Sequence, residues 1–534
     1  MRTSSLKRRS LPAAAIVVTS ALVLAACGGG TDAPSATDAG SSSDSTAAKD
    51  ADTATDSSTI TAAVAYDTDN YDPSNTTSAL ALAANWHTME GLTELDPATR
   101  EVYPALAGAL AEQVDDTTWE ATLRDGAKFS DGTDVTTDDV VNAFTMTMEG
   151  FYAPFLSFID SVEKKDDTTV TIKTKFPFSL VNERISLVKV FPASQSADEL
   201  KSKPIGTGPY KMTSAIKSKA VDFEKNDNYN GTRPAGAAKM HWDIQVDGTP
   251  RVTSMTTNTV MAMESVPAIN EQQLKDSGAT VESVQGFGLP FVMFNTKKAP
   301  FDNPKVRQAV LYGINTEQLI DNVLDGKAQP ATSFLQESHP NYHKASNVYN
   351  YDPEKSKQLL KEAGVEDLHF TLNTTDHPWV SQLAPIIKAN LEEAGITVDK
   401  IDSQASGAMY SNVTDVDDPQ FDVVVAPGDP SVFGNDPDLL MNWWYGDNAW
   451  TQKRSQWKGS DGYTKLHDLM DKAVRATGDE QQDLWNQCFD VISEEVPIYP
   501  LFHRAVTTAW NGDKLSGFQP SALTGMSFLD VKVK

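Results

Sequence analysis

A carboxylate and several aromatic residues follow the apolar segment 421–426, and their chemistry suits the binding of a small molecule. Asp429 comes three residues after this segment, and Phe433, Trp443 and Trp444 lie in and after a loop rich in Gly, Pro and Asp. A carboxylate can pair with an amine, and aromatic rings can cover apolar side chains or sugar rings. Two alternatives stay open: Asp429 caps the following turn, and the two tryptophans belong to the core of the following helix.

Residues that could catalyse a reaction do not form a recognisable set. Ser214 and Lys217 have Ser-x-x-Lys spacing but lack the companion motifs of that pattern, and the chain has neither a Gly-x-Ser-x-Gly elbow nor a phosphate-binding loop. His339 and His343 are four residues apart, a spacing that suits two metal ligands on one helix, but Pro340 disfavours a helix there. We therefore expect no enzyme activity, no bound metal and no cofactor.

Cys27 is the residue with the clearest predicted chemistry. Basic residues near the start precede a run of apolar and small residues over 11–26, which is typical of a secretory signal. The run Leu24-Ala25-Ala26-Cys27 resembles the bacterial lipobox, in which the cysteine receives a lipid and becomes the new N-terminus. The alternative, a transmembrane anchor, would need ~20 apolar residues. We expect a signal peptide over 1–26 and a protein anchored by lipid to the outer face of the cell membrane.

Composition excludes some partners. The formal net charge of −28 disfavours nucleic acid and anionic lipid surfaces. The 534 residues exceed what one compact core holds and suggest two or three domains. Cys488, the second of two cysteines, lies on an apolar helix face with Trp485 and Val491, which predicts a core residue rather than a reactive thiol.

The order of predicted elements indicates an α/β protein. Residues 27–58 are mostly Gly, Ser, Thr, Ala and Asp, which predicts a disordered tether. The folded part begins with a strand over 60–65. Further along, a strand (368–373), a helix (380–394) and a strand (396–401) predict a parallel crossover. Segment 421–426 reads as a buried strand, so Asp429 follows its carboxyl end, where ligands bind in open α/β sheets.

Several motifs in a fixed order resemble the family 5 solute-binding proteins of ABC importers, which include oligopeptide-, dipeptide- and nickel-binding proteins. The resemblance covers essentially all of 60–534. The motifs are Glu90-Gly91-Leu92, Tyr103-Pro104-Ala105-Leu106-Ala107, Leu123-Arg124-Asp125-Gly126-Ala127-Lys128-Phe129-Ser130-Asp131-Gly132-Thr133, Thr137-Asp138-Asp139-Val140, Gly206-Thr207-Gly208-Pro209-Tyr210, Asn226-Asp227-Asn228-Tyr229 and Asn303-Pro304-Lys305-Val306-Arg307-Gln308-Ala309.

The resemblance implies a two-lobed, periplasmic-binding-protein-like α/β fold of type II, in its large three-domain variety. Lobe I would comprise 59–75, 200–285 and 498–534, with a subdomain inserted over 76–199, and lobe II would comprise 286–497. The hinge would include Gly286, Gly288 and Pro497. The ligand-binding candidates are Asp429, Phe433, Trp443, Trp444, Ser78, Phe291 and Gln404.

Asp429 matches the aspartate with which peptide-binding members of the family hold the α-amino group of the ligand. The sequence departs from the family pattern here: the loop through Pro437 is longer, and Ala426 and Pro427 replace tryptophans that are common before the aspartate.

We therefore predict a monomeric, lipid-anchored receptor that captures a small solute, expected to be an oligopeptide, by lobe closure. It would deliver the solute to ABC permease and ATPase subunits. An oligosaccharide is the alternative ligand, supported by the tryptophan-rich segment 443–457. More distant alternatives are an extracellular hydrolase on the same scaffold and an adhesin without a transport role.

Overall fold

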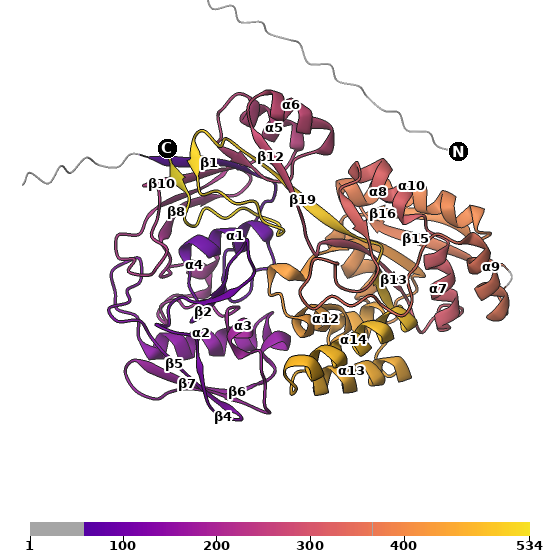
Figure 1. Cartoon of the computed structure of the whole chain (residues 1–534), viewed down its shortest axis with the longest axis horizontal. Helices are drawn as coiled ribbons and strands as arrows, with labels where there is room; N and C mark the ends of the chain where they lie inside the picture. The colour runs from indigo at the N-terminus through magenta and orange to yellow at the C-terminus, as the bar shows by residue number, and fades with distance from the viewer. Residues whose placement is uncertain (1–57, 366) are drawn as a thin grey trace, which may run out of the picture. The chain divides into compact units, whose positions relative to one another are not determined.

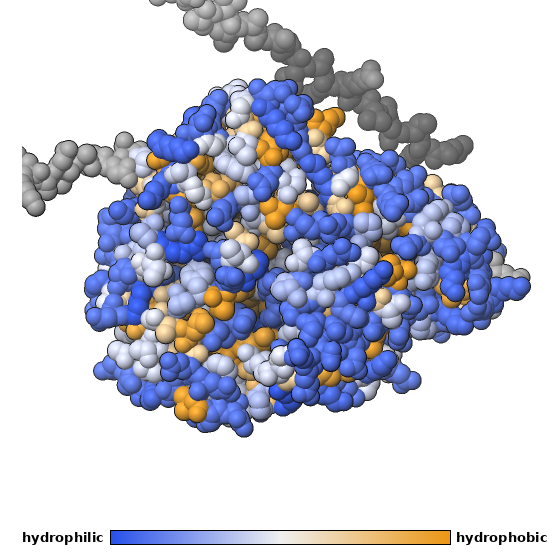
Figure 2. Space-filling view, in the orientation of Figure 1, coloured by the Kyte–Doolittle hydropathy of each residue, from blue (hydrophilic) through white to orange (hydrophobic). Residues whose placement is uncertain are grey.

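The structure is a computed structural model that describes residues 58–365 and 367–534. The predicted signal peptide, Cys27 and the tether up to residue 57 lie outside the described residues. Within the described ranges, each helix is too short or too polar to cross a bilayer. The face shown in Figure 2 is largely hydrophilic, with apolar residues in small groups, as the strongly acidic composition predicts.

The first large sheet has eight strands, ordered β12-β19-β11-β1-β10-β9-β8, with β14 paired to β19. Its strands come from separate parts of the chain: β1 (Thr59–Val64), β8 (Tyr210–Ile216), β9 (Ala220–Lys225), β10 (Lys239–Ile244), β11 (Ala262–Met263), β12 (Thr280–Gln285), β14 (Ala328–Pro330) and β19 (Phe502–Trp510). β1 runs parallel to β10 and β11. Helices α1 (Ala79–Thr88), α5 (Gly248–Thr256) and α6 (Glu271–Asp276) accompany this sheet. The predicted first strand is confirmed.

A smaller part of the chain forms its own four-stranded antiparallel sheet, ordered β4-β5-β7-β6. The strands are β4 (Glu112–Asp115), β5 (Thr118–Thr122), β6 (Ile159–Lys164) and β7 (Thr169–Thr174), with a β2–β3 hairpin (Thr93–Leu95, Val102–Pro104) nearby. The helices are α2 (Thr137–Glu149), η1 (Ala153–Leu156), α3 (Val181–Ile185) and α4 (Ala197–Ser202). Apolar residues of this part make a separate core around Phe144, Phe158 and Val170.

The second large sheet has the order β16-β15-β17-β13-β18. Its strands are β13 (Leu289–Phe294), β15 (His369–Thr375), β16 (Thr397–Gln404), β17 (Val423–Gly428) and β18 (Ile498–Pro500). β15 runs parallel to β16 and β17, whereas β13 is antiparallel to β17 and β18. The helix between β15 and β16 is α10 (Pro378–Glu393), so the predicted strand–helix–strand crossover is confirmed.

Helices surround this second sheet, with bounds α7 (Pro304–Tyr312), α8 (Thr316–Leu324), α9 (Pro353–Glu362), α11 (Ser406–Met409), α12 (Pro437–Tyr445), α13 (Asp461–Ala473) and α14 (Gly478–Glu495). α9 begins as predicted, because the Asp352 side chain accepts a hydrogen bond from Lys355 N and Pro353 takes the first helical position. Gly364 ends it in the left-handed region with φ 74°. Cys488 is fully buried on α14, which confirms its predicted core position.

Two neighbouring connections join the large sheets. β12 leads into β13 through residues 286–288, and β18 leads into β19 through Leu501. Figure 1 shows β19 running from the first sheet toward β13. The connections are hydrogen-bonded to each other, because Arg504 N donates to Gly288 O (2.7 Å) and Gly286 N donates to Arg504 O (3.0 Å). The chain therefore crosses between the two sheets as one paired ribbon.

Several of the sequence motifs described above make contacts within the fold. Arg124 forms a buried ion pair with Glu90 at 2.7 Å, which joins two of these motifs. Gly206 and Gly208 pass so close to the end of α1 that a Cβ on Gly208 would lie 2.5 Å from His87 O. Only glycine allows that approach.

We expect Gly208→Ala to destabilise the protein by about 1–3 kcal/mol, because the added methyl meets main-chain atoms that have no free space to move into. Urea unfolding measures the loss. Gly407→Ala is the matched control: nothing lies within 4 Å of the added carbon, so the free energy of unfolding should change by less than about 0.5 kcal/mol. Equal values for both variants would contradict the close approach.

Candidate functional site

The carboxyl ends of parallel strands from both large sheets meet beside the paired ribbon. Tyr66 follows β1, His377 follows β15 and Asp429 follows β17. All three interact electrostatically with Arg504, which lies on β19 where the chain crosses between the sheets. Segments separated by hundreds of residues thus bring charged and polar side chains together at the edge where α/β sheets bind ligands.

Asp429 has one occupied and one open carboxylate oxygen. Its Oδ1 accepts hydrogen bonds from the main-chain N (3.2 Å) and hydroxyl of Ser431, so it does cap the turn that begins η4 (Pro430–Val432). No donor within residues 58–365 and 367–534 reaches Oδ2, which lies beside Gly288. Burial raises the pKa of this carboxyl, while Ser431, Arg100 and Arg504 act in the opposite direction. The capping role thus leaves Oδ2 able to accept a bond from a ligand.

Arg100 joins this site to the β2–β3 hairpin. Its Nη2 donates to Ser431 O at 2.6 Å, while its buried Nε has no partner in the structure. Burial lowers the pKa of Arg100 to about 10, and Asp429 and Asp96 oppose that effect. Arg100 also lines a pocket whose other walls include Trp86, Glu94, Tyr152, Lys189, Val432 and Phe433.

Phe433 and Trp443 belong to an aromatic cluster that joins the smaller part of the chain to the second large sheet. Trp443 stacks on Phe155 of η1 (centroids 6.0 Å, planes 12° apart) and lies 5.2 Å from the ring of Phe433. Phe151 and Tyr152, which directly precede η1, also contact the ring of Phe433, with centroids 6.2 and 5.6 Å away. Phe433 also lines the pocket described above. Trp443 is not among the residues that line this pocket, and its ring packs against Phe155 and Phe433.

Trp444 and Phe291 lie in the core of the second sheet. Each is 1% exposed, and their rings pack against one another (5.7 Å) and against Trp450. Trp457 is equally buried. Trp444 is therefore a core residue, which is one of the two alternatives left open by the sequence. We propose no ligand contact for Trp444 or Phe291, and most of the tryptophan-rich segment has no free ring face to offer.

The remaining candidates occupy separate positions. Ser78 is half-buried and caps α1 by accepting from Ala81 N at 3.5 Å. Gln404 ends β16, where its main-chain O accepts from Asp376 N at 2.8 Å. Gly286 and Gly288 lie in the first connection, and Pro497 O accepts from Phe294 N (3.0 Å) just before the second. His339 and His343 bind separate partners, Asn435 O and Asp490.

Comparison with known proteins identifies the family. Residues 101–452, well over half of the chain, match the model of the bacterial extracellular solute-binding proteins, family 5. The chain belongs to this family. The glutathione-binding protein GsiB of Salmonella paratyphi A is 26% identical over 492 residues, covering 89% of this chain and 94% of that protein. The dipeptide-binding protein of Escherichia coli (strain K12) is 26% identical over 457 residues, covering 78% and 83%.

Solved structures agree on the fold of this family 5 protein. A dipeptide-binding protein from Pseudoalteromonas sp. SM9913, in complex with Met-Leu, matches with a TM-score of 0.76 at 20% identity, covering 89% of this chain and all of that one. NikA from Staphylococcus aureus, in complex with Ni(L-His)2, matches with a TM-score of 0.74 at 19% identity, with the same coverage. The predicted two-lobed α/β fold is confirmed. Proteins of this family bind solutes and are not enzymes.

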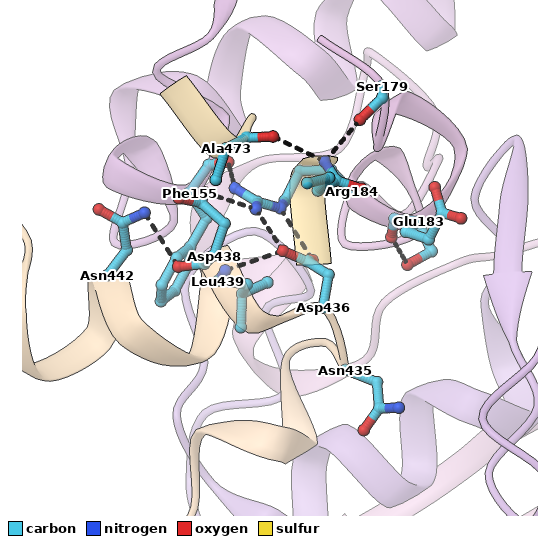
Figure 3. Close-up of polar contacts among 12 residues, drawn as sticks. Phe155, Ser179, Glu183, Arg184, Asn435, Asp436, Asp438, Leu439, Asn442 and Ala473 are labelled. Atoms are coloured by element: carbon cyan, nitrogen blue, oxygen red, sulfur yellow. Dashed lines mark hydrogen bonds and ion pairs between the residues drawn. The ribbon is translucent and has the colours of Figure 1, made fainter. Parts of the chain in front are cut away.

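A buried ion cluster joins two parts of this solute-binding protein that are predicted to belong to lobe I and to lobe II (Figure 3). Arg184 of α3 donates to Asp436 Oδ1 (2.7 Å) and Asp438 Oδ2 (2.9 Å) at the start of α12, and to Phe155 O (2.7 Å). All three charged side chains are less than 10% exposed. Asp436 also caps α12 by accepting from Leu439 N at 2.8 Å. We call Arg184, Asp436 and Asp438 the interlobe cluster.

Sequence reasoning missed the arginines that organise this site. Arg100, Arg184 and Arg504 are not next to any motif that signals binding, and their partners lie far away in the sequence. One signal was present for Arg504: it is a charge within the otherwise apolar and polar-uncharged strand 502–510.

We expect Arg184→Met to separate the lobes in the empty protein. The substitution leaves Asp436 and Asp438 buried without a counter-charge, which costs about 3–5 kcal/mol unless the lobes part and water reaches them. Small-angle X-ray scattering would then give a larger radius of gyration than for the unaltered protein.

Arg454→Met is the matched control for this experiment. Arg454 pairs with Asp415 at 2.7 Å, and both residues belong to the part of the chain around the second sheet. Its loss should lower stability without changing the radius of gyration. An unchanged radius for Arg184→Met would contradict a closing role for the interlobe cluster.

Proposed function

We propose that this protein captures an oligopeptide between its lobes and delivers it to the permease of an ABC importer. The observation that carries the proposal is the open Oδ2 of Asp429, placed at the carboxyl end of β17 beside the ribbon that joins the sheets. A carboxylate in a partly buried site binds an ammonium group strongly, because little water competes for either charge. The α-amino group of a peptide supplies that ammonium.

Relatives named for peptides support this ligand class. They include the glutathione-binding and dipeptide-binding proteins described above, and a di/tripeptide-binding protein of Pseudomonas aeruginosa that is 26% identical over 507 residues. Their ligands share an ammonium group and peptide bonds, to which Asp429 and neighbouring main-chain groups are suited. The tryptophan-rich segment gives little support to an oligosaccharide, since Trp444, Trp450 and Trp457 are all less than 10% exposed.

Capture would work by closure of the two lobes about the paired ribbon. In this proposal lobe I comprises 59–75, 200–285 and 498–534, with the subdomain 76–199, and lobe II comprises 286–497. Residues 498–500 pair with β13 before the chain returns to the first sheet, so the hinge would lie around Gly286, Gly288 and the Pro497–Leu501 region. A ligand favours closure only by the extra contacts it makes in the closed state.

The lipid anchor completes the proposed function. Cys27 follows an apolar run and small residues, as in bacterial lipoproteins, and a chain attached there would stay close to the membrane that holds the permease. We propose that the protein acts as a monomer, with no nucleic acid partner. A hydrolase would need a nucleophile paired with a base near Asp429, and an adhesin would need no lobe closure.

We expect Asp429→Asn to weaken binding of a free peptide such as trialanine by about 3–5 kcal/mol, because the ammonium is left without its counter-charge. The amide keeps an oxygen for Ser431, so the melting temperature should barely change. N-acetylated trialanine carries no ammonium and should bind both proteins alike. Because burial raises the pKa of Asp429, affinity for the free peptide should fall as the pH drops through that raised value.

Isothermal titration calorimetry with both peptides on both proteins decides the matter. Ser431→Ala is the control, since it removes the hydroxyl that Asp429 accepts from and leaves the carboxylate charge. If Asp429→Asn weakens the binding of both peptides by the same small amount, Asp429 does not belong to the ligand site. If neither peptide binds the unaltered protein, a peptide ligand is rejected.

We expect Cys27→Ala to abolish lipid attachment, because only the cysteine sulfur can form the thioether. Incorporation of labelled palmitate and separation of membrane from medium measure the effect. The altered protein should be released or remain as precursor. Cys488→Ala is the control and should keep the label, since that thiol is buried on α14. Palmitate on Cys27→Ala would reject the anchor.

A further inference from the structure

Two loops at one edge of the first sheet expose large apolar side chains. In the part of the chain that the structure describes, the two most exposed large apolar residues are Ile269 (91%) and Val246 (61%). Val246 follows β10, and Ile269 lies in η2 (Ala268–Asn270), which follows β11. Because β1 runs parallel to both strands, the two loops leave the same edge of the sheet. We call residues 245–250 and 265–270 the apolar loop pair.

The apolar loop pair forms one continuous surface. Strand β1 lies between β10 and β11, so the two loops begin about 10 Å apart. They then meet, because a Cβ on Gly248 would lie 2.7 Å from Pro267 Cγ. Pro250 beside them is exposed, and Ala268 is half-buried. Single exposed apolar residues are common on protein surfaces, whereas several on one surface mark a contact with another molecule.

A buried arginine holds the two loops in position. Arg251 is 4% exposed, and its guanidinium donates to four main-chain carbonyls, those of Gln245 (2.5 Å), Val246 (2.7 Å), Glu264 (3.2 Å) and Ser265 (3.0 Å). Ser265 has a φ of 52°, which residues with a side chain rarely adopt and which persists only where the surroundings impose it. The exposed apolar side chains therefore stand on a fixed main chain, and a partner does not have to order them.

The apolar loop pair lies beside the place where the predicted lobes meet. Ile269 is two residues before α6, and Glu271 of α6 forms an ion pair with Lys327, which lies between α8 and β14. Figure 1 shows α5 and α6 at the end of the first sheet nearest α8. Figure 2 shows a group of apolar residues at the edge of the molecule in the same region. A partner seated on the apolar loop pair would therefore reach both predicted lobes.

Charge favours one class of partner. The exposed charged residues between 245 and 276 are two carboxylates, Asp247 and Asp276, and one ammonium, Lys275. With a net charge of −28, the whole chain repels an anionic lipid surface and a second copy of itself. A partner with an apolar contact surface and basic residues around it fits both the loops and the charge.

Chain length allows such a partner to lie in the membrane. Thirty residues separate Cys27 from Ser58, and they extend to about 100 Å at about 3.5 Å per residue. A chain attached to lipid at Cys27 can therefore turn the apolar loop pair toward a membrane protein. Solute-binding proteins of this family work with ABC permease components.

We propose that the apolar loop pair is the surface by which predicted lobe I docks on the extracytoplasmic face of the permease, with Ile269 as its central contact. The inference rests on the proposed function and names the surface that serves it. The permease would offer an apolar recess for Ile269 and Val246, with basic residues around it. Because Arg251 fixes both loops, the same surface is presented whether or not a solute is bound.

Photo-cross-linking tests the contact without any solute. Benzoylphenylalanine replaces Ile269 in the full-length chain, in cells that make the chain and its importer. We expect a cross-link to an integral membrane subunit of an ABC importer, identified by mass spectrometry. Val114 is the matched control position, since it is also apolar and exposed (58%) but lies on β4 of the four-stranded sheet. Benzoylphenylalanine at position 114 should give no such product.

Uptake by the same cells tests the consequence. Ile269→Ser should lower the uptake of labelled trialanine by about 10-fold or more, as expected when a central interface contact is removed. The purified variant should bind trialanine as the unaltered protein does and keep its melting temperature, because the Ile269 side chain is exposed. Val114→Ser should leave uptake, binding and melting temperature unchanged.

Two results would overturn the docking surface. One is a cross-link from position 269 to lipid or to a second copy in place of a permease subunit, and the other is normal uptake by Ile269→Ser. Either leaves the peptide proposal standing if purified protein binds trialanine. If it binds no peptide, the proposed ligand is wrong, and the cross-link alone then decides whether this surface docks on the permease.

Discussion

The paired ribbon between the sheets is the constraint on which the rest of the site depends. The β12–β13 and β18–β19 connections cross side by side between the two large sheets. Main-chain hydrogen bonds of Arg504 with Gly286 and Gly288 hold these connections together at the crossing. The same point receives the carboxyl ends of β1, β15 and β17. In the proposed closure, a motion about this ribbon would change the distance between the lobes and leave Arg504 and Asp429 close to the axis.

Buried charge is used in two different ways in this protein. In the interlobe cluster, Arg184 is fully matched by Asp436 and Asp438, so the charges favour a closed arrangement. Beside the ribbon, Arg504 has no hydrogen-bonded partner and Asp429 keeps an open oxygen. In the proposed function, matched charges hold the lobes together, whereas unmatched charges leave a cost that a ligand of complementary charge would remove. This contrast would distinguish structural from binding groups, which the sequence motifs do not.

Local patterns predicted much of the fold. The crossover through α10, the cap at Asp352 and the buried strand before Asp429 depend on periodicity and on Gly, Pro and Asp positions, which are local properties. The site was only partly predictable. Asp429 follows a recognisable strand, but Phe291 and Trp444 look like ligand contacts until their mutual packing is known. Arg184 and Arg504 meet residues about 250 and 75 positions away, and no local pattern encodes such contacts.

Distance measurement between the lobes tests the central claim most directly. Spin labels can be placed at Val114 on β4 (58% exposed) and at Asp468, an exposed residue of α13, while buried Cys488 stays unlabelled. Double electron–electron resonance would then report the spacing with and without a peptide that calorimetry shows to bind. Closure about the ribbon predicts a single short distance with peptide and, without it, a broader distribution that includes both this short distance and longer ones. Identical distributions in the two states would contradict the account.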